Sequence, residues 1–261
     1  MRHLRLVVAF AFACCPALAQ TTTPSSSQAP APKDPQAVNI VAQALAVAGG
    51  VTAIAAINDY TATGNVTYYT GVNGNVSVGM TIRGKGLGQL RIDSNLPSGT
   101  RSESTDGLTT IKYESGYVKQ LHSHAPLYPA RLLLPFLQLK PAMTSPGFSL
   151  SYRGVVDVGG RPAHDVQIQR PLAPGSDPNN RLIEYLTVDY FIDSSTLQIV
   201  MMQDSVADFA PRQISYSDFR PIGGFLVPFS VNETVQGHQF RLFQLNQITF
   251  NSGLQDSDFQ L

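Results

Sequence analysis

The sequence predicts a mainly β fold with few helices, in which an antiparallel sheet follows a secretory signal. Most of the chain after Asn58 alternates apolar and polar residues with a period of two, the pattern of half-buried strands. Turn signals rich in Gly, Asn and Asp separate these stretches at short intervals, which indicates hairpins and therefore antiparallel pairing. Strands and helices do not alternate along the chain, so a parallel sheet is not expected.

The N-terminus has the three parts of a signal peptide. Arg2 and Arg5 form a short basic region, residues 6–13 are apolar, and Ala17-Leu18-Ala19 places small residues where a signal peptidase reads them. A retained membrane anchor would need about 20 apolar residues, more than this segment offers. We therefore expect cleavage after Ala19 and a periplasmic or secreted protein.

Cleavage at this site changes the composition of the mature chain. It removes Cys14 and Cys15, the only cysteines, so the mature protein has no disulfide. It also leaves 16 basic and 18 acidic residues, and without a basic excess we expect no nucleic-acid partner. In the alternative, Cys14 or Cys15 carries a lipid anchor, but the preceding Ala11-Phe12-Ala13 matches a lipidation signal poorly.

Residues 20–33 are rich in Pro, Ser and Thr and lack apolar periodicity, which predicts a flexible linker. We expect one domain over residues 34–261. Asp34-Pro35 is a typical helix start, and apolar residues at three- and four-residue spacing continue the helix to Ala48. Gly49-Gly50 ends it, and Ala53–Ile57 has the composition of one further helical turn.

Clean alternation of apolar and polar residues recurs along the rest of the chain. Residues 76–82, 186–192 and 225–231 show it best, and the spacing of the turn signals predicts about ten or eleven strands. The Gly-rich stretch at 84–88 is read as a hairpin turn, because no helix follows it that could bind phosphate.

One strongly apolar segment, Ala125–Pro141, interrupts the sheet. Its prolines exclude a long helix, so we expect a short helix near Ala130–Leu134 with apolar flanks. Two interpretations stay open. The segment either plugs an open end of the sheet as ordinary core, or forms a lid over a cavity.

Catalytic signatures are absent from the sequence. It contains no nucleophile elbow, phosphate-binding loop or zinc-protease motif, and the mature chain has no cysteine nucleophile. His122 and His124 would share one face of a strand, but no third metal ligand stands at a fixed spacing. Asp204 and Asp208 give no basis for acid–base roles. We expect no enzyme activity, no metal and no cofactor; a hydrolase with scattered catalytic residues is a remote alternative.

Several short motifs together resemble the LolA-like superfamily, the periplasmic carriers of outer-membrane lipoproteins and their relatives. They are the strand Gly88–Asp93, the hairpins Thr105–Tyr113, Gly154–Val166 and Tyr190–Leu197, the pair Tyr216–Phe219 with Gly223–Pro228, and the closing segment Phe250–Phe259. The resemblance implies a half-barrel: a strongly curved antiparallel sheet whose concave face is covered by an N-terminal helix and a short mid-chain helix. It also implies a cavity for acyl chains, lipoproteins or another apolar ligand.

The cavity that this resemblance implies can be assigned to residues. The sheet face should include Val76, Val78, Met80, Ile82, Leu90 and Ile92, and the cover should include Val41, Leu45, Leu132, Leu133, Phe136 and Leu137. We expect a monomer that binds a lipid or lipoprotein acyl chain. The alternative is an envelope sensor or protein-interaction module without transported lipid, whose apolar face contacts a protein.

Overall fold

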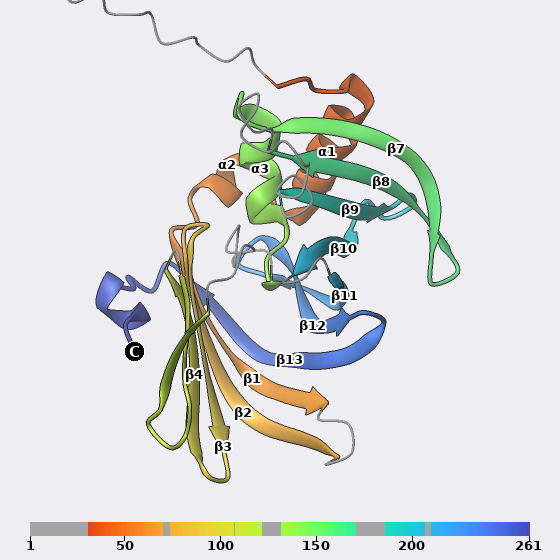
Figure 1. The fold of residues 1–261 in the computed structure, drawn as a ribbon. Coiled ribbons are helices and arrows are strands. Elements are labelled where there is room, and N and C mark those ends of the chain that lie inside the picture. The colour runs from red at the N-terminus through yellow and green to blue at the C-terminus, as the bar shows by residue number, and fades with distance from the viewer. Residues whose placement is uncertain (1–30, 70–73, 107, 122–131, 171–185, 207–209) are drawn as a thin grey trace, which may run out of the picture.

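A computed structural model describes residues 31–69, 74–106, 108–121, 132–170, 186–206 and 210–261. These residues form one antiparallel sheet of 13 strands that curves strongly and does not close (Figure 1). The predicted mainly β half-barrel is confirmed. No helix among these residues is long and apolar enough to cross a membrane.

Two meanders build the sheet. The first contains β1 (Asp59–Tyr69), β2 (Asn75–Lys85), β3 (Gln89–Leu96), β4 (Gly99–Asp106), β5 (Leu108–Lys112) and β6 (Val118–Leu121). The second contains β7 (Ser149–Val158), β8 (Arg161–Gln169), β9 (Thr187–Asp193), β10 (Ile199–Val206), β11 (Ala210–Ile222), β12 (Phe225–Val235) and β13 (His238–Phe250). Strand β1 pairs with β13 and joins the meanders, so β6 and β7 form the two edges.

The sequence pattern underestimates the number of strands. Strand β4 reads GTRSESTD and has no apolar residue to alternate with its polar ones. Its pairing with β3 and β5 continues the ladder all the same, because backbone hydrogen bonds do not depend on side-chain polarity. Alternation therefore detects only strands with one apolar face.

Helix α1 (Pro35–Ala48) confirms the predicted N-terminal helix. The Asp34 carboxylate accepts a 2.7 Å hydrogen bond from the Gln36 amide, and Gly49 ends the helix at a φ of 134°. A side chain there would be strained and would also meet the Phe225 ring, since an added Cβ lies 2.7 Å from its Cδ1. The short helix α2 (Val51–Ala55) follows.

The described mid-chain helix lies after the segment for which a helix was predicted. Helix α3 spans Phe136–Thr144, whereas the pattern placed a helix near Ala130–Leu134; residues 122–131 lie outside the described part. Leu132 has 3-10 geometry, and the residues before it are not described, so the predicted helix near Ala130–Leu134 stays untested. Helix α3 itself was not predicted: Pro135 occupies its N-cap, where a missing amide costs nothing, and Pro141 lies inside it. Helix α3 packs against α1, α2 and β7.

The last residues of the predicted linker already contact the domain. The Lys33 ammonium donates to the carbonyls of Ala142 at 2.6 Å and Phe148 at 2.8 Å, and the amide of Asp34 donates to the carbonyl of Leu150. Ala31 is buried. These contacts tie the start of α1 to β7.

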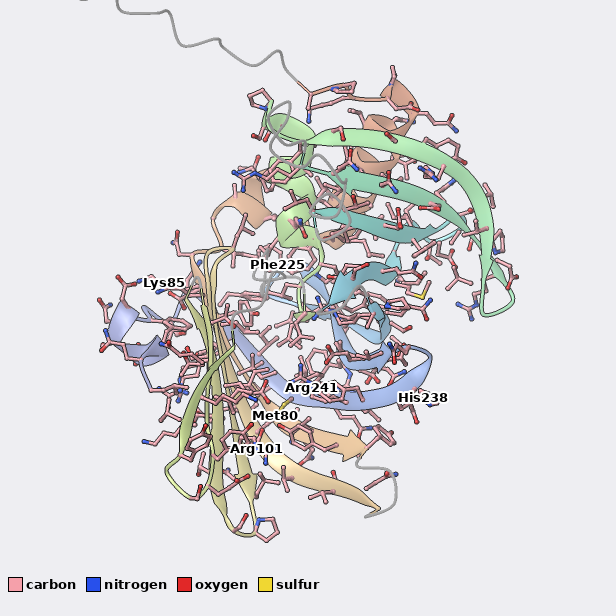
Figure 2. All side chains as sticks on the ribbon, viewed as in Figure 1. Met80, Lys85, Arg101, Phe225, His238 and Arg241 are labelled. Carbon is pink, nitrogen blue, oxygen red and sulfur yellow. The ribbon has the colours of Figure 1, made fainter. Side chains whose placement is uncertain are left out.

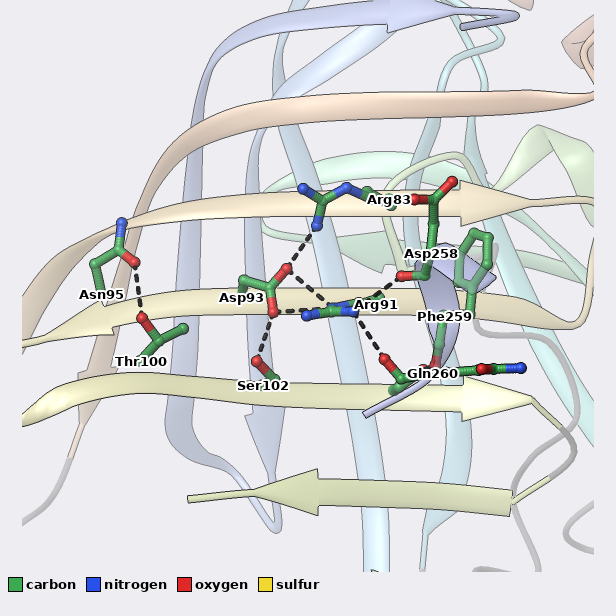
Figure 3. A network of polar contacts seen from close by, with 10 residues as sticks. Arg83, Arg91, Asp93, Asn95, Thr100, Ser102, Asp258, Phe259 and Gln260 are labelled. Carbon is green, nitrogen blue, oxygen red and sulfur yellow. Dashed lines mark hydrogen bonds and ion pairs between the residues drawn. The ribbon is translucent and has the colours of Figure 1, made fainter. Parts of the chain in front are cut away.

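The outer face of β2–β4 holds the C-terminal segment (Figure 3). Asp93 accepts hydrogen bonds from Arg83, Arg91 and Ser102, and Arg91 also donates to the carbonyls of residues 258 and 260. Burial opposes ionisation of Asp93, but these donors outweigh it and hold its pKa below the usual value. The short 3-10 helix η4 (Asp256–Phe259) packs against β3 and β4 there, so this part of the outer face has a structural role.

Candidate ligand-binding site

The concave face of β2 and β3 carries the apolar residues predicted for a cavity wall. Ile82 pairs with Ile92, and the alternate residues on both strands point to the same face. Five of the six predicted sheet residues are buried: Val78, Met80, Ile82, Leu90 and Ile92. The sixth, Val76, is partly buried against the same core.

The predicted cover residues also lie in this core. Val41 and Leu45 of α1 are fully buried, as is Leu133, while Leu132, Phe136 and Leu137 are nearly so. Phe136 stacks on Phe225 of β12 with ring centroids 6.4 Å apart. The structure therefore brings all twelve predicted residues into or against one apolar cluster between the helices and the sheet.

Pockets border this cluster in the described part of the chain. A pocket of about 300 Å³ lies beside α2, α3 and the β2–β3 turn, where Leu137 and Leu87 line it and Lys140 contributes to its wall. A pocket of about 430 Å³, which we call the distal pocket, includes Val76 and the aromatic residues Tyr68 and Tyr113. A much smaller space of about 10 Å³ lies between α1 and β10–β12 and touches Phe136.

Strand β2 leads from the distal pocket to the pocket beside α3. Val76 lines the distal pocket, Val78, Met80 and Ile82 follow on the same face, and Leu87 in the next turn lines the other pocket. Residues on one face of a strand repeat every two positions, so this wall is continuous and apolar. Between the two pockets these side chains are covered by the core, so an extended apolar ligand would lie along β2 only after the covering side chains move aside.

A chain of ion pairs crosses the same concave face, and the sequence analysis missed it. Its members, each paired with the next, are Glu103, Arg241, Glu233, Arg212 and Asp204. Arg241 donates from Nη1 to Glu103 at 2.9 Å and from Nε to Glu233 at 2.8 Å. Arg212 donates twice to Asp204, at 2.6 and 2.8 Å.

The Glu103–Arg241 pair shows how strongly the sheet curves. Strands β3, β2 and β1 separate β4 from β13, a distance of about 19 Å along a flat sheet. The two side chains meet only because the sheet bends until β4 faces β13. This ion pair joins the two meanders across the concave face, and Figure 2 labels Arg241.

Arg241 and Arg212, the two arginines of this row of ion pairs, both remain charged. Burial would lower the pKa of Arg241, but the carboxylates of Glu233 and Glu103 raise it above the ordinary value. For Arg212, burial also opposes the charge, and Asp204 and Glu233 again raise the pKa. In the sequence, Arg241 stands two residues before Phe243 and four before Leu245, so a strand places it on their apolar face. This spacing was the sequence signal for a buried arginine.

Of the remaining sequence candidates, His122, His124 and Asp208 lie outside the described residues, and Asp204 is bound to Arg212. Residues 86–88 form the predicted hairpin turn. Within the described ranges, no three His, Cys, Asp or Glu side chains group as metal ligands would.

The fold matches solved structures of LolA-like proteins. A domain described as an outer membrane lipoprotein-sorting protein, from Vibrio parahaemolyticus, covers 86% of this chain and 96% of its own, with 11% identity and a TM-score of 0.55. A LolA superfamily protein from Nitrosomonas europaea gives 10% identity and a TM-score of 0.56, covering 86% of this chain and 97% of its own. A DUF1329 family protein from Desulfovibrio piger gives 10% and 0.55, covering 86% and 96%.

These similarities show a LolA-like fold. No family model matches the sequence, and no curated protein matches it. At this level of identity the likeness concerns the fold alone, so the function has to be argued from this chain's own residues.

Proposed function

We propose that the protein is a periplasmic carrier or binding protein for acyl chains or a similar apolar ligand, held on the concave face of the half-barrel. The observation that carries the proposal is the continuous apolar wall of β2, which has a pocket at each end. The proposal includes no catalytic step, no metal and no cofactor.

The energetics suit reversible binding. Burying a methylene group contributes about 0.8 kcal/mol, so ten methylenes supply roughly 8 kcal/mol before costs. Association and ordering subtract several kcal/mol. The remainder corresponds to weak or micromolar binding, from which a carrier can release its cargo.

Helix α3 is the element that we expect to move when the ligand enters. Its N-cap, Pro135, makes no side-chain capping hydrogen bond, and Pro141 removes an amide donor from its interior. Leu137 faces the pocket beside α2. A small displacement of α3 would join this pocket to the apolar wall behind it without breaking any strand pairing.

The place of action follows from the signal sequence. We propose that the mature protein begins at Gln20 and acts in the periplasm or outside the cell as a single 34–261 domain behind the linker. N-terminal sequencing of the exported protein tests this. A chain that retains Met1, or one that begins with a lipidated Cys14 or Cys15, would contradict it.

The ligand itself is tested in two steps. Apolar molecules extracted from the purified mature protein are identified by mass spectrometry, and the protein is then titrated with a fluorescent fatty-acid ester. We expect Leu87→Trp, which fills the pocket beside α3 from a turn, to weaken probe binding by about tenfold. Val155→Trp is the matched control, because Val155 is 55% exposed and lines none of the three pockets.

The interaction-module alternative has one observation in its favour. Tyr117 and Val118 are 63% and 46% exposed at the start of β6, an edge strand of the described sheet. If no lipid is extracted and no probe binds saturably, the carrier proposal fails, and this edge becomes the first surface to test for a protein partner.

A further inference from the structure

The distal pocket differs from the rest of the apolar wall because it contains charged groups. It is bounded by the far ends of β1–β3, by β4 and β5, and by Phe240 of β13. Its lining is mainly apolar or aromatic, with Tyr68, Val76 and Tyr113 among its members. Its volume, about 430 Å³, lies within the range of small-molecule sites, about 300–1,000 Å³.

Arg101 is the pocket residue with an unused hydrogen-bond donor. Its Nη2 contacts Glu114 at 3.1 Å, and its guanidinium lies over the Tyr113 ring, 5.2 Å from the centroid. These two contacts fix the plane of the group. Its Nε is buried and has no hydrogen-bond partner within the described part of the chain. A buried donor without an acceptor is costly, so a ligand that supplies an acceptor there gains affinity.

The charges around the pocket indicate which acceptor fits. Glu103 is paired with Arg241, and Glu114 is paired with Arg101. Each guanidinium beside the pocket therefore already has a carboxylate. The carboxylates of Glu103 and Glu114 would repel an anionic ligand, and no unpaired arginine among the described residues beside the pocket would offset that repulsion. A neutral carbonyl oxygen would not be repelled.

We propose that the distal pocket binds the neutral, carbonyl-bearing head of an amphipathic ligand, an acyl ester or amide, with the Arg101 Nε–H donating to the carbonyl oxygen. The acyl chain then runs from Val76 along β2 toward Met80. This proposal rests on the proposed function and adds to it the class of headgroup and the orientation of the ligand. Met80 pairs with Ser94 and Ser94 with Arg101, so Met80 and Arg101 share one face of the sheet; Figure 2 labels both.

The test compares two probes that differ only at the head. A dodecanoic acid labelled at its far end and its methyl ester are titrated by fluorescence anisotropy at neutral pH, against the mature protein. We expect wild type to prefer the ester, and Arg101→Met to weaken ester binding by about tenfold while changing acid binding much less. Arg101→Lys keeps the charge but not the guanidinium N–H, so it should also lose the preference.

Arg220→Met is the matched control. Arg220 also pairs with a carboxylate, Asp218, and lies over an aromatic ring, that of Phe229, but it does not line the distal pocket. It should bind both probes as wild type does. Circular dichroism melts show whether each variant is folded, and Arg101→Lys replaces Arg101→Met if the latter is not.

Two results would overturn the proposal in distinguishable ways. If wild type binds the acid as tightly as the ester, or if folded Arg101 variants keep the ester preference, the headgroup assignment is wrong and the carrier proposal stands. If neither probe binds wild type, both proposals fail.

Discussion

Removing Arg241 should destabilise the protein more than the loss of any surface ion pair. Its side chain is only 10% exposed, and it bonds to Glu233 and Glu103. In Arg241→Met, the Glu233 carboxylate, which is 3% exposed, keeps only the 3.5 Å contact with Arg212. Breaking a buried pair from one side costs about 3–5 kcal/mol, because the other charge stays buried without its partner.

We expect a value near the lower end of that range. Glu103 is 23% exposed and can regain water, and Glu233 retains one cation. Against a total stability of about 5–15 kcal/mol, the loss is a large fraction of what holds the domain together. Urea denaturation of the mature protein, followed by circular dichroism, measures it from the shift in midpoint at constant slope.

Lys85→Met provides the comparison for this measurement. The Lys85–Asp256 contact is 2.6 Å, shorter than either contact of Arg241, but its side chains are 33% and 76% exposed. Exposed pairs contribute little because water screens them. If Arg241→Met costs no more than Lys85→Met, the ion pairs are hydrated in solution and our reasoning about their burial is refuted. A double-mutant cycle with Glu103→Gln then isolates the contact that spans the sheet.

Three further changes test the packing and the charges. Burial and the neighbouring Asp189 raise the pKa of Asp165 to about 6, so the folded protein should lose stability as the pH rises from about 4 to 6, and Asp165→Asn should remove that loss in urea titrations at several pH values. Tyr60→Phe should leave the melting temperature unchanged or raise it, because the buried Tyr60 hydroxyl has no partner within the described residues. Gly84→Ala should cost roughly 1–3 kcal/mol in urea denaturation, because the new Cβ would lie 2.4 Å from the Tyr60 ring; an unchanged midpoint would show that the ring moves freely.

Local signals predicted the elements that local interactions stabilise. Asp34 and Gly49 mark the two ends of α1 because capping and left-handed backbone involve only neighbouring residues. The sequence did not predict α3, for a related reason. A proline reads as a break in sequence, yet Pro135 serves as the N-cap of α3 and Pro141 is tolerated in a helix packed against α1.

Alternation also identified which residues share the concave face. Val78, Met80 and Ile82 are on one side of β2 because a strand repeats every two residues, whatever the fold. The sequence could therefore assign these side chains to an apolar wall. It contained no information on where the wall meets open space, because the pockets depend on how the helices and the turns lie against it.

The sequence by itself determined the antiparallel meander, the first helix and the apolar face, since each follows from the period and from neighbouring residues. Only the tertiary structure decided that Glu103 meets Arg241 across 138 positions, and that Arg101, beside Tyr68 and Val76, has a buried donor without a partner among the described residues. The physical reason is curvature. The bend of the whole sheet, summed over its strands, brings β4 opposite β13, and no short stretch of sequence specifies that sum.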